Sequence, residues 1–170
     1  YRGRYFNGTD QYMKFDDFTL GFRFTILTWI RLDDLVADYT IFSKDRKTGN
    51  FGTQGTVFKA IVKTTSGFLS ASLADADDWT SIGTVTSSGA VKVEAADWTH
   101  VGYSVDLLTT AIGVNINFWI NDGTHETTTL AGHYYLDDTT FYDTYIGTHR
   151  TGDSVFAGDL KGFMFNFYIY

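Results

Sequence analysis

The chain has 170 residues, a mass of 19.1 kDa and 44% hydrophobic residues, which suits one packed domain over residues 1–170 and excludes a disordered chain. It contains 0 cysteines and 0 prolines, so a disulfide framework, a thiolate nucleophile and a cysteine-based zinc site are excluded. The net charge of −7, with basic residues scattered along the sequence, argues against nucleic acid and anionic membrane surfaces as partners.

Apolar and polar residues alternate with a period of two along much of the chain, which is the pattern of strands that bury one face. The first long run places Phe24, Ile26 and Ile30 on one face and Trp29 and Arg31 on the other. Further runs cover residues 69–73, 101–105, 112–120 and 163–169. In the last run, the alternation predicts one shared face for Phe163, Phe165, Phe167 and Ile169.

Turn-forming residues separate these runs, at Asn7-Gly8, Ser66-Gly67, Ser88-Gly89 and Asn121-Asp122-Gly123. No stretch repeats apolar residues at helical spacing, residues 94–97 can form one helical turn at most, and no apolar run reaches the ~20 residues of a membrane helix. The sequence therefore predicts an all-β fold of two packed sheets or a barrel. Both ends have a strand pattern and can pair side by side, and the start at Tyr1 suggests a processed chain or an excised domain.

Seven short segments, taken in order, resemble the strands of laminin-G-like domains. They are YFNGTDQY (5–12), FTILTWI (24–30), IFSK (41–44), WTHV (98–101), FWINDG (118–123), YIG (145–147), and FAGDL with FYIY (156–160 and 167–170). The resemblance implies a concanavalin A-like lectin/glucanase jelly roll, which is a two-sheet antiparallel β-sandwich with one concave face. Because that superfamily includes lectins, adhesion modules, pentraxins and some glycoside hydrolases, the fold alone does not fix the function.

Two features depart from the family pattern. Many members carry acidic residues shortly after the closing glycine motif, where this chain has Lys161 and Gly162. Laminin-type members often have a disulfide near the end, which a chain without cysteine cannot form. The first departure argues against a metal or catalytic role at those two positions.

The enzyme branch of the superfamily most often places paired carboxylates on one strand, as E-x-D-x-x-E, so that acid and nucleophile flank a sugar ring. This chain has only two glutamates, Glu94 and Glu126, and they belong to different segments. The sequence also lacks H-x-x-H spacing, a G-x-S-x-G elbow and a phosphate loop. We therefore expect a protein that is not an enzyme.

Calcium is the cofactor that the sequence suggests, because Asp75, Asp77 and Asp78 crowd into one expected loop. Such closely spaced carboxylates form either a calcium site completed by backbone carbonyls or a solvated, aspartate-rich turn. Asp10 together with Asp159 is a further candidate pair, since the two ends of such folds meet. The pairs at 16–17, 33–34 and 137–138 are expected to be strand-end turns.

Ligand binding by stacking needs aromatic side chains outside the core, and Trp79, Tyr134 and Tyr135 are the candidates in expected loops. A polar and aromatic stripe follows one face of a strand, at Asn115, Asn117, Trp119 and Asn121. For Trp29, Trp98 and Trp119 we expect core packing or cover for the second sheet. Asn7-Gly8-Thr9 is the one N-x-T glycosylation acceptor of the chain, and it is also a favoured turn.

The leading hypothesis is a non-catalytic recognition or adhesion module, extracellular or at the cell surface, that binds a glycan or a protein surface with or without calcium. The alternative is a structural building block of a cell-surface or filament assembly, in which the aromatic residues pack against neighbouring domains. A glycoside hydrolase is the third hypothesis, which the missing carboxylate pair disfavours. We expect neither nucleic acid binding nor insertion into a membrane.

Overall fold

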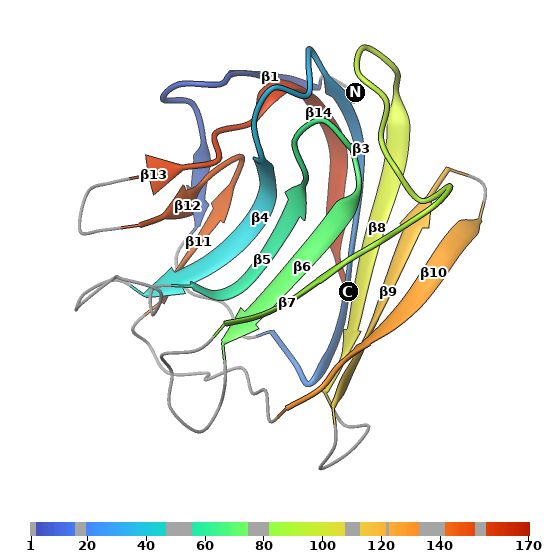
Figure 1. Cartoon of the computed structure of the whole chain (residues 1–170). Coiled ribbons are helices and arrows are strands. Elements are labelled where there is room, and N and C mark those ends of the chain that lie inside the picture. The colour runs from blue at the N-terminus through green and yellow to red at the C-terminus, as the bar shows by residue number, and fades with distance from the viewer. Residues whose placement is uncertain are drawn as a thin grey trace.

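The computed structural model describes residues 3–15, 20–46, 56–74, 82–107, 113–121, 123–132, 142–151 and 156–170. In this part of the chain the strands form two antiparallel sheets that face each other (Figure 1), and no α-helix is present. The all-β sandwich expected from the period-of-two pattern is therefore confirmed. Nothing in the same ranges is helical, long and apolar enough to span a lipid bilayer.

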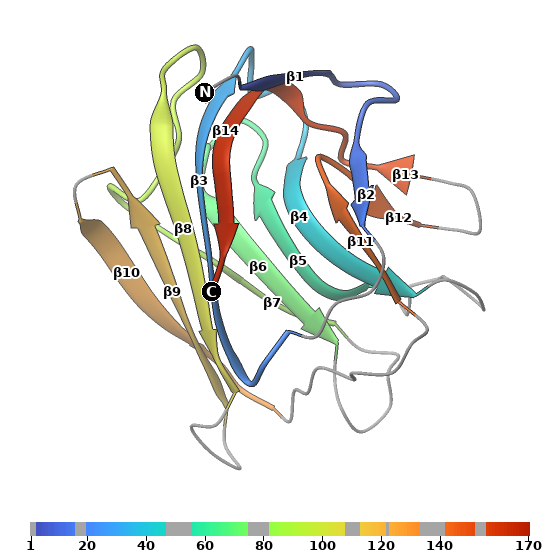
Figure 2. The same cartoon turned by 180° about the vertical axis from the view of Figure 1, so that it is seen from behind.

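Sheet A contains six strands in the order β1 (Arg4–Asn7), β14 (Lys161–Ile169), β3 (Arg23–Leu32), β8 (Thr99–Asp106), β9 (Val114–Ile120) and β10 (Thr124–Leu130). Its first strand along the chain pairs with its last, Tyr5 lying opposite Phe163. This pairing confirms the expectation that the two ends of the sequence lie side by side. Figure 2 shows this sheet from its outer side.

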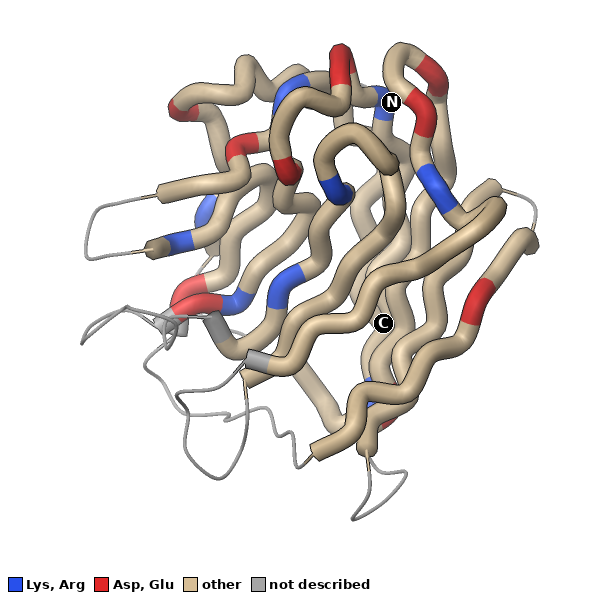
Figure 3. Tube along the Cα trace, viewed as in Figure 1, with Lys and Arg blue, Asp and Glu red and all other residues tan. Residues whose placement is uncertain are grey.

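Sheet B also contains six strands, in the order β2 (Met13–Phe15), β11 (Tyr142–Ile146), β4 (Tyr39–Arg46), β5 (Thr56–Val62), β6 (Leu69–Ala74) and β7 (Ile82–Thr86). A small hairpin of β12 (His149–Arg150) and β13 (Phe156–Ala157) lies beside β4. Many of the charged positions lie in turns at the end of the sandwich near the N-terminus, whereas β6 and β7 carry no charged residue (Figure 3).

The core lies between the two sheets and is filled by alternate residues of each strand. In β3 the residues Phe24, Ile26 and Ile30 are buried, as the alternation predicts. Phe24 meets Phe58 of sheet B edge to face, with ring centroids 5.0 Å apart, so that aromatic packing joins the two layers. The residues between the buried ones in β3 point to the outer side of sheet A.

A β-bulge in β14 overturns the prediction that its four bulky residues share one face. Phe165 pairs with Trp29 and Tyr168 pairs with Leu27, so β14 carries one residue more than β3 between these pairs. Asn166 absorbs the irregularity with a φ of 51°. The extra residue reverses the alternation, so Phe163 and Phe165 face outward while Phe167 and Ile169 pack against the core (the last two are partly buried).

Candidate binding surface

The outer side of sheet A carries an open groove walled by aromatic rings. Trp29, Trp98, Phe163 and Phe165 line it together with Gly3, and its volume is about 490 Å³. Trp29 is 38% exposed and Trp98 is 47% exposed. We call these five residues the aromatic groove.

Strand register brings these rings together from distant parts of the sequence. Phe165 of β14 lies opposite Trp29 of β3, and both point outward. Trp98 directly precedes β8, whose first residue, Thr99, pairs with Ile30 of β3. The groove therefore spans three adjacent strands, and it exists because the bulge in β14 leaves its two phenylalanines on the outer face.

The rings of this surface are tilted against one another rather than coplanar. The Tyr5 and Phe163 centroids are 4.9 Å apart with an interplanar angle of 56°. Those of Trp98 and Phe163 are 6.2 Å apart at 48°. Such tilted rings form the walls of a groove. A groove of this shape suits a single flexible polymer strand as ligand better than the flat face of a crystalline solid.

An arginine holds the turn before Trp98 in place. The Arg31 Nε atom donates a hydrogen bond of 2.8 Å to the carbonyl oxygen of Ala96, whose φ is 65°. The guanidinium carbon of Arg31 also lies 6.0 Å from the ring centre of Phe163, within the range of a cation–π contact. Arg31 thereby links the Trp98 turn to β14, and Trp98 is positioned before any ligand arrives.

A second, polar depression adjoins the groove at Trp98, which lines both. Its volume is about 430 Å³. Its other lining residues are Ala90, Lys92, Glu94, Asp97, Thr99, Ile120 and Asn121. We call it the polar cleft, because hydroxyl-bonding groups stand there next to the face of an indole ring.

The outer face continues along β9 as the stripe that the sequence predicts. Trp119, Asn117 and Asn115 are all partly buried and alternate with buried core residues, which confirms that they share one face. The Thr127 hydroxyl donates to Asn117 Oδ1 at 2.6 Å, and the Thr129 hydroxyl donates to Asn115 Oδ1 at 3.0 Å. We call these two asparagines and two threonines the asparagine ladder.

The expectation that Trp29, Trp98 and Trp119 pack in the core or cover the second sheet is wrong, because all three lie on the outer side of sheet A. The even-numbered residues of β3 point into the core, so Trp29 lies on the outer side together with Arg31. That signal is present in the sequence, because an indole that alternates with the core residues of a strand and shares its face with arginine points away from the core. Trp98 gives no such signal, since it precedes its strand.

The candidate ligand residues Trp79, Tyr134 and Tyr135 and the candidate calcium ligands Asp75, Asp77 and Asp78 lie outside the described residues, so they stay predictions. Within the described ranges, no group of three or more histidine, cysteine or acidic residues is arranged to hold a metal ion. The remaining candidate pair has other contacts. Asp10 accepts a hydrogen bond of 2.7 Å from Asn7, and Asp159 accepts one of 2.6 Å from Thr148.

The acceptor asparagine Asn7 ends β1 and is exposed. Its side-chain oxygen accepts hydrogen bonds from the backbone N–H groups of Thr9 at 3.0 Å and Asp10 at 3.3 Å. This arrangement is an Asx turn, which accounts for the turn expected at this position. Its exposure leaves it accessible to modification.

The two glutamates are held in separate contacts. Glu94 lies in the turn before β8 and forms an ion pair of 2.7 Å with Lys92. Glu126 is on β10 and accepts hydrogen bonds from the Ser88 backbone N–H at 2.6 Å and from its hydroxyl at 3.1 Å. They are not carboxylates on one strand, so the arrangement that glycoside hydrolases of this fold use is not formed by these residues.

His149 lines a different cleft, which Tyr39 and Gly158 also border. Burial, reinforced by the Lys59 ammonium, lowers the pKa of His149 to about 4. Its Nδ1 atom lies 2.8 Å from the Thr40 hydroxyl and its Nε2 atom 3.4 Å from Lys59 Nζ. A neutral imidazole that accepts from the ammonium through Nε2 and donates to Thr40 through Nδ1–H satisfies both contacts, so His149 ties β12 to sheet B.

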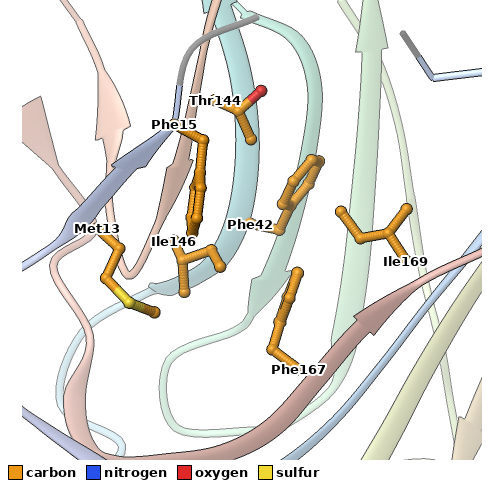
Figure 4. Close-up of a pocket in the computed structure, with 7 residues that line it drawn as sticks. All are labelled: Met13, Phe15, Phe42, Thr144, Ile146, Phe167 and Ile169. Atoms are coloured by element: carbon orange, nitrogen blue, oxygen red, sulfur yellow. The ribbon is translucent and has the colours of Figure 1, made fainter. Parts of the chain in front are cut away.

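An apolar pocket of about 380 Å³ lies between the sheets where β2 and β11 face β14 (Figure 4). Its walls are Met13, Phe15, Phe42, Thr144, Ile146, Phe167 and Ile169. Phe167 and Ile169 reach it because the bulge turns them inward. The pocket carries almost no polar surface and therefore lacks the hydroxyl-bonding groups of the polar cleft.

The family model for the concanavalin A-like lectin/glucanases superfamily matches residues 7–166. The chain therefore belongs to this superfamily, and the laminin-G-like resemblance of its seven segments is confirmed. Membership supports a binding module, since the superfamily is rich in domains that bind carbohydrates or proteins. No curated protein sequence matches the chain.

Solved structures share the fold at low sequence identity. The native heptameric SAP-like pentraxin from Limulus polyphemus matches with a TM-score of 0.67 and 16% identity, covering 97% of this chain and 73% of the pentraxin. The CBM40 of the Ruminococcus gnavus IT-sialidase bound to α2,3-sialyllactose matches with a TM-score of 0.68 and 17% identity, over 87% and 75% of the two chains. The LG1-3 region of the laminin α2 chain matches with a TM-score of 0.65 and 13% identity, over 97% and 30%. Identities this low establish the architecture alone.

Proposed function

We propose that this chain is a non-catalytic recognition module that binds a glycan on the outer side of sheet A. The observation that carries the proposal is the placement of Trp98 between the aromatic groove and the polar cleft. A sugar ring has an apolar C–H face and a rim of hydroxyl groups, so it needs an aromatic face and polar groups side by side. Trp29 and Trp98 are exposed on a sheet whose backbone is fixed by its ladders, so little ordering is needed on binding.

The remaining parts of the hypothesis extend this proposal. The whole of residues 1–170 acts as one module, outside the cell or at its surface, where a glycan on Asn7 is accepted because that side chain is exposed. Calcium bound by Asp75, Asp77 and Asp78 orders the loop that they share. The separate contacts of Glu94 and Glu126 support a role without catalysis.

A glycan array probed with the purified chain, with and without calcium, tests the proposal, and isothermal titration then measures the affinity for the glycans that bind. Trp98→Ala should abolish or strongly weaken this binding. Phe22→Ala is the matched control, because Phe22 is an exposed aromatic residue (57% exposed) that lines neither depression and should leave the affinity unchanged. An array without signal would refute the proposal, and so would sustained release of reducing sugar from a bound glycan, since that is catalysis.

A structural role remains the second candidate function, because exposed rings continue beyond the groove. Tyr168 and Tyr170 stack with centroids 6.1 Å apart, and both are exposed on the same sheet. A neighbouring protein domain that covered this face would bury a large apolar area. Sedimentation of the purified chain at rising concentration separates the two functions, since self-association that is abolished by Trp98→Ala, without glycan binding, would favour assembly.

A further inference from the structure

We infer that the ligand is a linear neutral glycan that crosses the outer side of sheet A from the aromatic groove to Trp119 and then follows β9 along the asparagine ladder. The inference rests on the proposed function and deepens it, because it names the ligand class and the path. On this inference the protein binds extended polysaccharide chains rather than single terminal sugars.

Cross-strand pairs place the parts of this path in consecutive rows on one face. Trp29 lies opposite His100 of β8 and belongs to the aromatic groove. One row further along the strands, Leu27 lies opposite Gly102, and Gly102 lies opposite Trp119 of β9. Trp119 therefore lies one row along and two strands across from Trp29, and Tyr168 lies opposite Leu27 at the other end of the same row.

Gly102 determines how Trp119 lies. A Cβ atom at this glycine would stand 2.8 Å from Leu27 Cδ2 and 3.0 Å from Trp119 Cε3, so both side chains lean over the glycine. Trp119 is partly buried, so part of its indole stays accessible beside the glycine. An indole in this position offers a continuous apolar floor on which a second sugar ring can stack.

The asparagine ladder follows on the same strand. Asn115 lies four residues from Trp119, which is about 13 Å at the rise of an extended strand. Because each ladder threonine donates its hydroxyl hydrogen to an asparagine Oδ1 atom, the two Nδ2 groups face away from that bond with hydrogens that no described residue accepts. Each row of the ladder therefore offers an amide donor on β9 beside a threonine oxygen acceptor on β10, and together they match sugar hydroxyls, which both donate and accept.

Charge and ring geometry narrow the ligand class. Asp97 and the Lys92–Glu94 ion pair border the path at the polar cleft, which leaves one uncompensated carboxylate there, and the whole chain has a net charge of −7, so a polyanionic glycan is disfavoured. The angle of 48° between Trp98 and Phe163 disfavours the flat surface of an insoluble crystal. A soluble chain of neutral sugars, whose ring faces are free of charged substituents, fits both constraints.

The test compares affinity with chain length. Soluble β-1,4-linked gluco-, xylo- and manno-oligosaccharides and β-1,3-linked gluco-oligosaccharides, from disaccharide to hexasaccharide, are titrated into the wild-type chain. We expect at least one series to bind with an affinity that rises from the disaccharide to the hexasaccharide. Trp98→Ala should weaken binding of every length in that series.

Substitutions in the asparagine ladder test the proposed glycan path independently of the aromatic groove. The double variant Asn115→Ala with Asn117→Ala should weaken hexasaccharide binding by about fivefold for each lost hydrogen bond and leave the disaccharide unaffected. Asn117→Asp keeps the acceptor for Thr127 and the side-chain shape but removes the amide donor, so it should show the same length-dependent loss without a loss of fold. Thr86→Ala, on the edge strand β7 of sheet B, is the matched control and should leave every affinity unchanged.

The outcomes distinguish this inference from the proposed function. If array glycans bind but only branched, charged or terminal sugars are among them, or if affinity does not depend on length, the extended path is refuted while the proposed function stands. If the ladder variants bind the hexasaccharide like the wild type, the path is refuted as well. If no glycan of any kind binds, or if Trp98→Ala binds normally, both fail together.

Discussion

Replacing Trp98 by alanine removes the side chain that the aromatic groove shares with the polar cleft, and its effect can be worked out from the structure. A tryptophan contributes up to about 250 Å² of surface, and 47% of it is exposed in the free protein. A ligand that covers this exposed part buries about 100 Å², which is worth about 2.5 kcal/mol at 25 cal/mol per Å². We therefore expect a loss of affinity of up to about 60-fold.

The same substitution also removes the half of the indole that packs on Phe163 and the neighbouring turn, so the domain itself becomes less stable by about 2 kcal/mol. Thermal unfolding must accordingly be measured beside isothermal titration, at a temperature at which both proteins are folded. Wild-type affinity in a folded Trp98→Ala chain would refute the reasoning. A variant that binds poorly only because it is unfolded would be recognised from its circular dichroism.

Three further predictions concern the fold. Gly67→Ala should lower the free energy of unfolding, measured by denaturation, by about 3 kcal/mol, because the φ of Gly67 is 69° and a Cβ atom would stand 1.9 Å from the Val93 carbonyl oxygen. Gly89→Ala is the comparison, because Gly89 has a φ of 56° with open space around it, and it should lower the same free energy by about 1 kcal/mol. His149 has a pKa of about 4 in the folded chain and about 6.5 in the unfolded chain, so its contribution to the free energy of unfolding is complete above pH 6.5 and is lost as the pH falls toward 4. His149→Gln should make the urea denaturation midpoint depend less on pH across this window. An unchanged dependence of the midpoint on pH would contradict the assignment. Asn166→Gly should be tolerated at the bulge, whereas Asn166→Val should cost about 1–2 kcal/mol because β-branched residues disfavour a φ of 51°; equal thermal midpoints for the two variants would contradict that role.

Much of the architecture follows from alternation, because one buried face repeats every second residue in a strand. The run around Phe24 and Ile26 has the parity that the structure shows, and the hairpin at Asn121 and Gly123 lies where its residues predict a turn. The order of the motifs supplied the remaining information, since two antiparallel sheets with both ends paired is the arrangement that the family resemblance implies.

The position of the binding surface could not be predicted in the same way. A bulge inserts one residue without any strong sequence signal, and in β14 that residue decides whether Phe163 and Phe165 lie in the core or on the outer face. Trp98 joins the groove only because Arg31 bonds to the turn that precedes it, a contact between residues far apart in the sequence. Aromatic content therefore predicted exposed rings, but the register of three strands determines where those rings gather.

The most direct test of the central claim, that the outer side of sheet A binds glycan, is to follow the indole N–H signals of the four tryptophans by nuclear magnetic resonance during a glycan titration. We predict that the signals of Trp29 and Trp98 shift together with that of Trp119. A shift of the Trp79 signal alone would contradict the claim and place the binding site in the loop beside the aspartate cluster.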